Sequence, residues 1–395
     1  MQNATQVHPL RSPDLPPLWL AASAMAAGIV VAFGVVRWVG HFLSDPNAED
    51  FRLQLVAARI GITHGWSHIY DFDLQRAASA GIGPIDSVHL FVNPPPTAWI
   101  GVPLAGLPVS TGYLIWTLVN LAAFVAACWL VAPGPRLVRV TVLLVSLAVW
   151  PVHYQFWLGQ WVAATLALLA VSWWLLEHDH WGPAGVVLAL SFFLKPQDAL
   201  LVPVVLLVSG RWKPVAVCAL TGASVAALSA ASLGSAGLSS WLHDIALVRT
   251  DPQSATMTYS FVFKQASLAT GVEVILGLAA IGLARYRRER LDLVFALGIV
   301  GTTASATHLH EDDIAMLVLA AWIVLRARPS LTQRAWLLAG IGAAQFIAIG
   351  LPIPMLLWQP VWIALLGLEP RLQRLEGRRA ARDLAGSPSA SAANP

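Results

Sequence analysis

The chain has 395 residues, of which 57% are hydrophobic and only 11% charged, and its mean hydropathy is +0.67. Soluble domains carry about 25% charged residues, so this composition excludes an ordinary soluble enzyme, a disordered chain and a nucleic-acid-binding protein. The net charge of +3 and the pI near 9.1 fit a membrane protein, whose basic residues mainly set its orientation.

Long tracts without Asp, Glu, Lys or Arg predict the fold class. They cover residues 15–36, 87–135, 140–176, 214–243, 293–310 and 335–368. A bilayer core requires roughly 20 apolar residues per helix, so the sequence predicts an all-α polytopic membrane protein. The first tract is longer than the roughly 7–15 apolar residues of a signal peptide and is predicted to be the first span.

About twelve spans are predicted in chain order. They lie at residues 17–39, 109–132, 138–152, 161–176, 183–195, 197–209, 214–233, 268–284, 291–307, 313–326, 333–350 and 353–368. This predicts one transmembrane domain over 1–370, a large first extracytoplasmic loop over 40–108, and a basic, disordered cytoplasmic tail over 371–395. Within the loop, the proline-rich segment 94–107 is expected to be re-entrant or interfacial.

The basic residues predict the orientation. With both termini in the cytoplasm, 17 of the 24 Lys and Arg residues fall on the cytoplasmic side, as the positive-inside rule requires. One long helix over 181–210 would invert every later loop, so two short helices that meet at Lys195-Pro196 are predicted. This topology brings ionisable residues from separate segments to the extracytoplasmic face, where such costly groups indicate function.

Asp50 is the first candidate residue. Leu53, Val56, Ala57 and Ile60 recur at helical spacing, which predicts an amphipathic helix over 51–61 with Asp50 at its start. Asp50 is therefore either a helix cap or a carboxylate kept ionised by the helix terminus.

Four further candidate residues lie at the predicted extracytoplasmic face, and each has a structural as well as a functional interpretation. Lys195 is either an anion ligand or a lysine that extends from the end of a span to water. His308 and His310 are two apart, so they share a face only in an extended segment, and a metal site with Asp312 or Asp313 stays open. Gln160 either caps the next span or contacts a ligand.

The first loop and three later motifs resemble glycosyltransferase family 87, a family of the GT-C superfamily. The loop matches at Asp50-Phe51, at Ala57-Ala58-Arg59, at Ile69-Tyr70-Asp71 and at Phe91 with Pro94-Pro95. The later matches are Gly159-Gln160, Gly185 with Lys195-Pro196, and Thr307-His308-Leu309-His310 with Asp313. Asn93 and Ala306 depart from the family pattern, where an aromatic residue and a proline are common.

The resemblance implies a GT-C-like bundle that transfers a sugar, with mannose as the first expectation, from a polyprenyl-phosphate donor. The acceptor is a lipid-linked or cell-wall glycan at the extracytoplasmic face of the cell membrane. Asp50 is implied as the general base of an inverting transfer. The donor phosphate is expected to bind Lys195, His308, His310 and Arg59, and the substrates to bind Gln160, Tyr70, Asp71, Asp313 and Trp161.

No cofactor or bound metal is predicted, and the expected partners are the donor, the acceptor and membrane lipids, without nucleic acid. Trp161 could instead belong to the aromatic belt at the membrane interface.

Two other functions stay open. Twelve spans with broken helices also fit a secondary transporter, although the large first loop has no counterpart in the second half, and a non-catalytic relative of the family would also fit the sequence.

Overall fold

The computed structural model describes residues 18–46, 48–83, 90–248 and 256–367. Every element that these residues form is a helix. The helices are α1 (Leu18–Ser44), α2 (Glu49–Thr63), η1 (Trp66–His68), α3 (Phe72–Ala78), α4 (Pro95–Gly101), η2 (Val102–Leu104), α5 (Val109–Val131), α6 (Arg136–Leu147), α7 (Trp150–Leu158) and α8 (Val162–Glu177). They continue with α9 (Trp181–Leu194), η3 (Pro196–Asp198), α10 (Leu201–Val208), α11 (Trp212–Val248), α12 (Tyr259–Val262), α13 (Ala266–Tyr286), α14 (Leu291–Ser305), η5 (Asp312–Ala315), α15 (Met316–Arg326) and α16 (Leu331–Ile347), followed by a helix at Ile353–Gly367.

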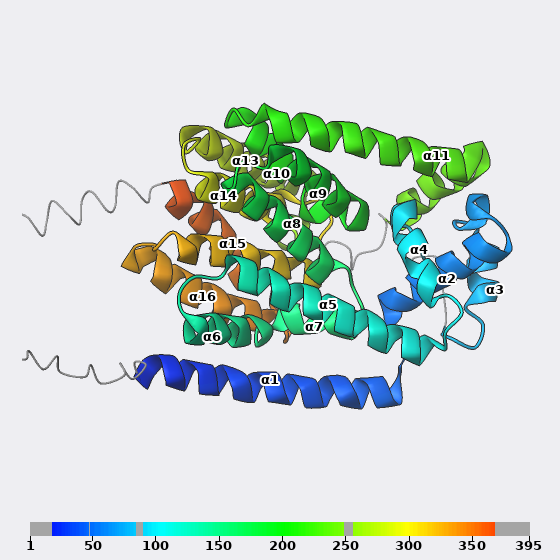
Figure 1. Ribbon diagram of the computed structural model, residues 1–395, viewed down its shortest axis with the longest axis horizontal. Coiled ribbons are helices and arrows are strands. Elements are labelled where there is room, and N and C mark those ends of the chain that lie inside the picture. Colours follow the sequence, from blue (N-terminus) through cyan, green and yellow to red (C-terminus); the bar gives the residue numbers. More distant parts are fainter. Residues whose placement is uncertain (1–17, 47, 84–89, 249–255, 368–395) are drawn as a thin grey trace, which may run out of the picture.

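The long helices form a bundle that carries the first-loop helices at one end. Figure 1 shows α1 and α11 along opposite sides of the bundle, with α2, α3 and α4 together beyond its right-hand end. The predicted cytoplasmic tail lies outside the described residues.

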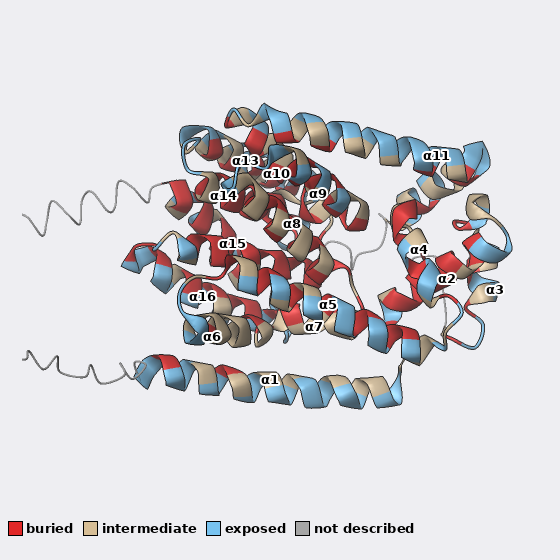
Figure 2. Cartoon of the chain, in the orientation of Figure 1, coloured by how far each residue is buried: buried red, intermediate tan, exposed pale blue. Residues whose placement is uncertain are grey.

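Burial divides the bundle into a core and a periphery. Twelve residues of α14, from Leu293 to Ala304, are buried, whereas Leu20 and Ala27 are the buried residues of α1. Figure 2 accordingly shows α14 and α15 largely red and α1 largely pale blue. A helix that is apolar on all sides suits either a protein core or a lipid environment, and α1 has the second character.

The described helices confirm an all-α membrane protein. Four of them, α1, α5, α11 and α13, are long and apolar enough to cross a membrane. The pair α6 and α7, bent by 64°, would make a fifth. Each predicted span coincides with a helix, but several helices have only 8–17 residues. The count of twelve spans is therefore not confirmed.

Two breaks in the helices have local causes. The predicted break at Lys195-Pro196 is present, since α9 ends at Leu194 and a 3-10 turn precedes α10. A second break lies at Gly234, whose φ of 63° interrupts α11, close to the predicted end of that span at residue 233. Beyond Gly234, α11 continues to the first loop, where Trp241 Nε1 donates a hydrogen bond to the Val92 carbonyl (2.9 Å).

The first loop folds around α2. The predicted helix over 51–61 is present, but the prediction that it is amphipathic is wrong, because every residue from Phe51 to Ala58 is buried. It packs against α3, α4, η1 and η2, so it has no free polar face. The predicted re-entrant or interfacial segment 94–107 forms α4 and η2, and both lie against α2.

Candidate active site

A polar cavity of about 170 Å³ lies where the first loop meets the bundle. We call it the Asp50 cavity. Its walls come from chain segments that lie far apart in the sequence: α2, the end of α7, the α9–η3 junction and the segment before η5. The residues that line it are Glu49, Asp50, Leu53, Leu90, Val92, Asn93, Tyr154, Leu158, Gln160, Lys195, Gln197, Val248, His308, His310 and Asp312.

Asp50 lies in the first turn of α2 and is partly buried. It is not the helix cap, because the cap position belongs to Ala48. Burial raises the pKa of the Asp50 carboxyl to about 6, and the negative charge of Asp312 acts in the same direction. Lys195 and His310 lower the pKa and offset part of this effect. Such a carboxyl group is mostly ionised near pH 7 but is a stronger base than an ordinary aspartate.

Gly159 lets α2 approach the bundle closely. It ends α7 with a φ of +72°, and a Cβ atom at this position would lie 2.6 Å from Phe51 Cβ. The indole of Trp116 donates a hydrogen bond to the Gly159 carbonyl (2.8 Å), which anchors this turn to α5. The Gly159-Gln160 motif thereby places Phe51, and with it the adjacent Asp50, beside Gln160.

Lys195 forms a buried ion cluster at the base of the cavity. Its Nζ donates a hydrogen bond to Asp312 Oδ2 (2.6 Å) and forms an ion pair with Asp313. Both carboxylate side chains are fully buried, and Lys195 is 4% exposed. Asp313 Oδ2 also accepts a hydrogen bond from the backbone N–H of His310 (2.8 Å). The cluster therefore joins the α9–η3 junction to the histidine segment.

His308 and His310 lie in an irregular segment, so both reach the cavity. Their ring centroids are 5.0 Å apart and the rings are nearly perpendicular. This agrees with the expectation that residues two apart share a face only in a non-helical segment.

Five residues of the predicted site do not line the Asp50 cavity. Arg59 donates hydrogen bonds to the carbonyls of Ala105 and Leu107 (both 2.9 Å), Asp71 caps α3, and Asp313 lies behind Lys195. Trp161 is buried edge-on against Trp116, with ring centroids 4.1 Å apart. The Tyr70 hydroxyl donates to the carbonyl of Asn93 (2.6 Å), so Tyr70 supports the cavity wall.

Sequence reasoning missed some of the lining. Tyr154 and Gln197 face the cavity but were not singled out, although each lies within six residues of a recognised motif. The sequence offers Asp312 only as a possible metal ligand, whereas it binds Lys195. The run Glu311-Asp312-Asp313 beside an apolar segment could have predicted this ion pair, because buried carboxylates need a cation as a partner.

A metal site is not formed by the described side chains. No group of three or more His, Cys, Asp or Glu among them is placed to hold a metal ion. His310 and Asp312 both line the cavity, but Asp312 is occupied by Lys195.

Comparison with known proteins identifies a family. The model of glycosyltransferase family 87 matches residues 91–309, and no curated protein or solved structure matches the chain. The matched region begins after Asp50 and includes Gln160, Lys195 and His308 of the cavity. Because the match covers more than half of the sequence, the chain belongs to glycosyltransferase family 87.

Proposed function

We propose that this membrane glycosyltransferase transfers mannose from a polyprenyl-phosphate donor to a lipid-linked or cell-wall glycan, at the extracytoplasmic face of the cell membrane and with inversion. The observation that carries the proposal is the shared cavity of Asp50, Gln160, Lys195, His308 and His310. It combines a carboxylate with cationic or hydrogen-donating groups, and a transfer from a sugar phosphate requires both.

Asp50 is proposed as the general base. The oxygen of an acceptor hydroxyl attacks the anomeric carbon of the donor sugar, and the hydroxyl proton passes to the Asp50 carboxylate. The bond from the anomeric carbon to the phosphate oxygen breaks, and polyprenyl phosphate leaves with the electron pair. Attack from the side opposite the phosphate inverts the configuration at the anomeric carbon.

The departing phosphate is proposed to bind His308 and His310. Lys195 contributes more weakly, since an ammonium group has three N–H donors and Asp312 and Asp313 engage two of them. Gln160 and Tyr154 are then left to orient the sugar or the acceptor from the α7–α8 side. Tyr70, Asp71, Arg59 and Trp161 act through the fold of the first loop and α8.

The test uses the purified full-length chain with labelled polyprenyl-phosphate mannose and a membrane lipid extract, and it identifies the glycolipid that forms. A parallel reaction with polyprenyl-phosphate glucose tests the choice of sugar. Asp50→Asn should lower the transfer rate about 10²- to 10⁴-fold, the range expected for a general base. Asp73→Asn is the control, because Asp73 is exposed in the same loop and pairs with Arg76 outside the cavity.

Two results would contradict the proposal. Transfer by Asp50→Asn at the wild-type rate would remove Asp50 as the base. Failure to use any polyprenyl-phosphate sugar, combined with use of a nucleotide sugar, would replace the donor. Preference for glucose over mannose would correct the sugar alone.

A further inference from the structure

An apolar groove of about 500 Å³ lies between α1, α6, α15 and α16. We call it the Arg328 groove, after an arginine at one of its ends. Its volume falls in the range of roughly 300–1,000 Å³ typical of ligand sites. Apolar side chains such as Val145, Ala321 and Leu338 form most of its walls, so an apolar ligand would fit it.

Residues of α1 form part of one wall. Trp19 and Leu20 of α1 line the groove, and Trp19 is 69% exposed. On the opposite side, Trp322 Nε1 donates a hydrogen bond to Ser146 Oγ (2.9 Å), so these two polar groups satisfy each other. The groove therefore offers hydrocarbon contacts along its length, and its exposed lining residues Trp19 and Leu338 leave it open to the outside.

Two arginines stand at one end of the groove. Arg328 and Arg334 line it beside Pro329, and both residues are exposed. Arg334 Nε donates to the Pro329 carbonyl (3.0 Å), which fixes the side chain near the groove entrance. The described residues that line the groove include no Asp or Glu. This end is thus cationic without an opposing acidic wall.

The cationic end lies far from the Asp50 cavity. α15 begins directly after η5, which contains Asp312, and runs eleven residues to Arg326. At 1.5 Å per residue, this helix separates the arginines from the ion cluster by roughly 17 Å. A ligand head bound at Arg328 would therefore not reach the proposed base.

We propose that the Arg328 groove binds an anionic membrane lipid, with an acyl chain in the groove and the phosphate at Arg328 and Arg334. The shape supplies the apolar part of the fit and the arginine pair supplies the charge complementarity. Arginine side chains pair with phosphate through several N–H donors, and basic residues at a membrane surface attract anionic lipids.

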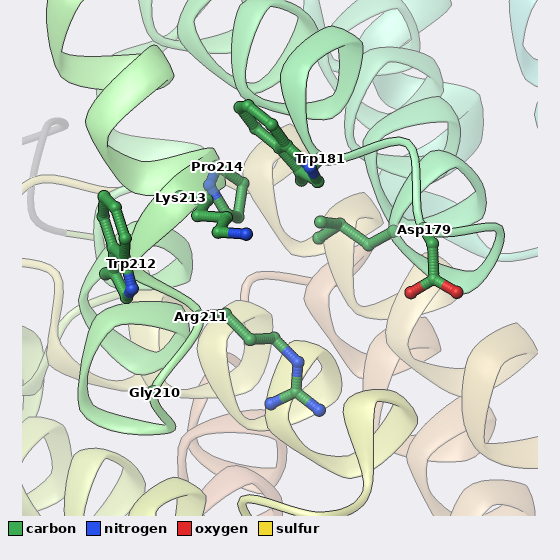
Figure 3. Close-up of a pocket in the computed structure, with 8 residues that line it drawn as sticks. Asp179, Trp181, Gly210, Arg211, Trp212, Lys213 and Pro214 are labelled. Carbon is green, nitrogen blue, oxygen red and sulfur yellow. The ribbon is translucent and has the colours of Figure 1, made fainter.

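A second basic pocket at the same end of the bundle serves as a comparison. It has a volume of about 220 Å³ and includes Arg211 and Lys213 (Figure 3). Asp179 also lines it, and Lys213 lies over the ring of Trp181 at 5.6 Å. This pocket has positive charge but no long apolar groove. Loss of its charges therefore measures the general attraction of anionic lipid, which can be compared with binding in the Arg328 groove.

The experiment measures the thermal unfolding midpoint and lipid retention by native mass spectrometry for the purified full-length chain. The probes are phosphatidylglycerol, phosphatidylcholine and soluble glycerol phosphate. Phosphatidylglycerol should raise the midpoint more than phosphatidylcholine, and glycerol phosphate should have no effect. Arg328→Gln with Arg334→Gln should weaken phosphatidylglycerol binding about 30-fold, since each basic group contributes roughly a fivefold factor.

Three further variants keep the test decisive. Arg328→Lys with Arg334→Lys should retain most of the preference for phosphatidylglycerol. Ala321→Phe, which fills the groove, should weaken binding of both lipids. Lys213→Gln with Arg211→Gln removes the two charges of the second basic pocket and should leave the preference unchanged.

Four outcomes would overturn the proposal. The first is equal binding of phosphatidylglycerol and phosphatidylcholine by the wild-type chain, and the second is an equal loss of phosphatidylglycerol binding in the two double glutamine variants. The third is that soluble glycerol phosphate, without any acyl chain, is enough to raise the unfolding midpoint. The fourth is a dimer whose second copy fills the groove and excludes lipid.

Discussion

Opposing influences act on the Asp50 carboxyl group. Burial and the negative charge of Asp312 raise its pKa, whereas Lys195 and His310 lower it, and the result is a pKa of about 6. The buried ion cluster therefore affects the proposed base without containing it. A general base is most effective when its pKa lies near the working pH, so this environment suits proton transfer at neutral pH.

The pH dependence of transfer should report this carboxyl group. A base must be deprotonated, so kcat/KM should fall about tenfold per pH unit below pH 6 and level off above it. Asp312→Asn removes a negative charge that raises the Asp50 pKa, so its acidic limb should move to lower pH. Transfer rates measured from pH 4.5 to 8 for the wild-type chain and for Asp312→Asn test the direction of this shift. A limb that moves to higher pH in Asp312→Asn would contradict it.

Lys195 should contribute strongly to stability. Lys195→Met leaves Asp312 and Asp313 buried without their cation, and loss of one partner of a buried ion pair costs about 3–5 kcal/mol. Lys213→Met changes an exposed lysine and should cost less than about 0.5 kcal/mol. Denaturant unfolding measures both. Adding Asp312→Asn to Lys195→Met should recover part of the loss, and failure to recover any would indicate another cause.

The sequence predicted the polar residues that meet at the cavity better than those behind it. Asp50, Lys195 and His310 could be predicted because ionisable groups beside apolar spans are energetically costly and therefore indicate function. Arg59 could not be placed, since its partners are the carbonyls of Ala105 and Leu107. Those carbonyls belong to a non-helical turn whose position depends on tertiary packing.

At the scale of elements, two close contacts decide where α2 lies. Gly159 approaches Phe51 on one side, and Gly101 of α4 approaches Ala58 on another. Periodicity predicted α2 but not that it is buried all round, because its apolar spacing reveals one packed face only. The coverage by α3, α4 and the 3-10 turns comes from segments whose sequences carry weak helical signals.

Gly159→Ala therefore tests whether the Phe51 contact positions Asp50. The new Cβ would collide with Phe51 and displace the start of α2, so transfer should fall at least tenfold. Gly210→Ala is the matched control, because Gly210 also has a positive φ (+90°) but no atom within 4 Å of the added Cβ. Backbone strain should cost each variant about 1–2 kcal/mol of stability, and the collision with Phe51 should add roughly 1–3 kcal/mol in Gly159→Ala, as measured by denaturant unfolding. Equal activity in the two would show that the Phe51 contact does not position Asp50.

At the scale of the whole molecule, the charges separate along the bundle. The Asp50 cavity occupies the end beside the first loop, whereas Arg326 pairs with Glu177 at the other end of α15 and α8. The arginine-rich turn between α13 and α14 lies at the opposite end of α14 from the histidine segment. This separation supports the proposed orientation, in which the basic end faces the cytoplasm.

Cysteine labelling in intact cells tests that orientation. Asp73 in α3 and Glu289 in the α13–α14 turn have side chains that are 82% and 86% exposed, while both native cysteines are buried. Asp73→Cys should react with a membrane-impermeant thiol reagent added to intact cells, because the first loop is proposed to be extracytoplasmic. Glu289→Cys should react only after the membrane is permeabilised. The reverse pattern would place the Asp50 cavity in the cytoplasm, where a nucleotide sugar could reach it, and would redirect the search for the donor.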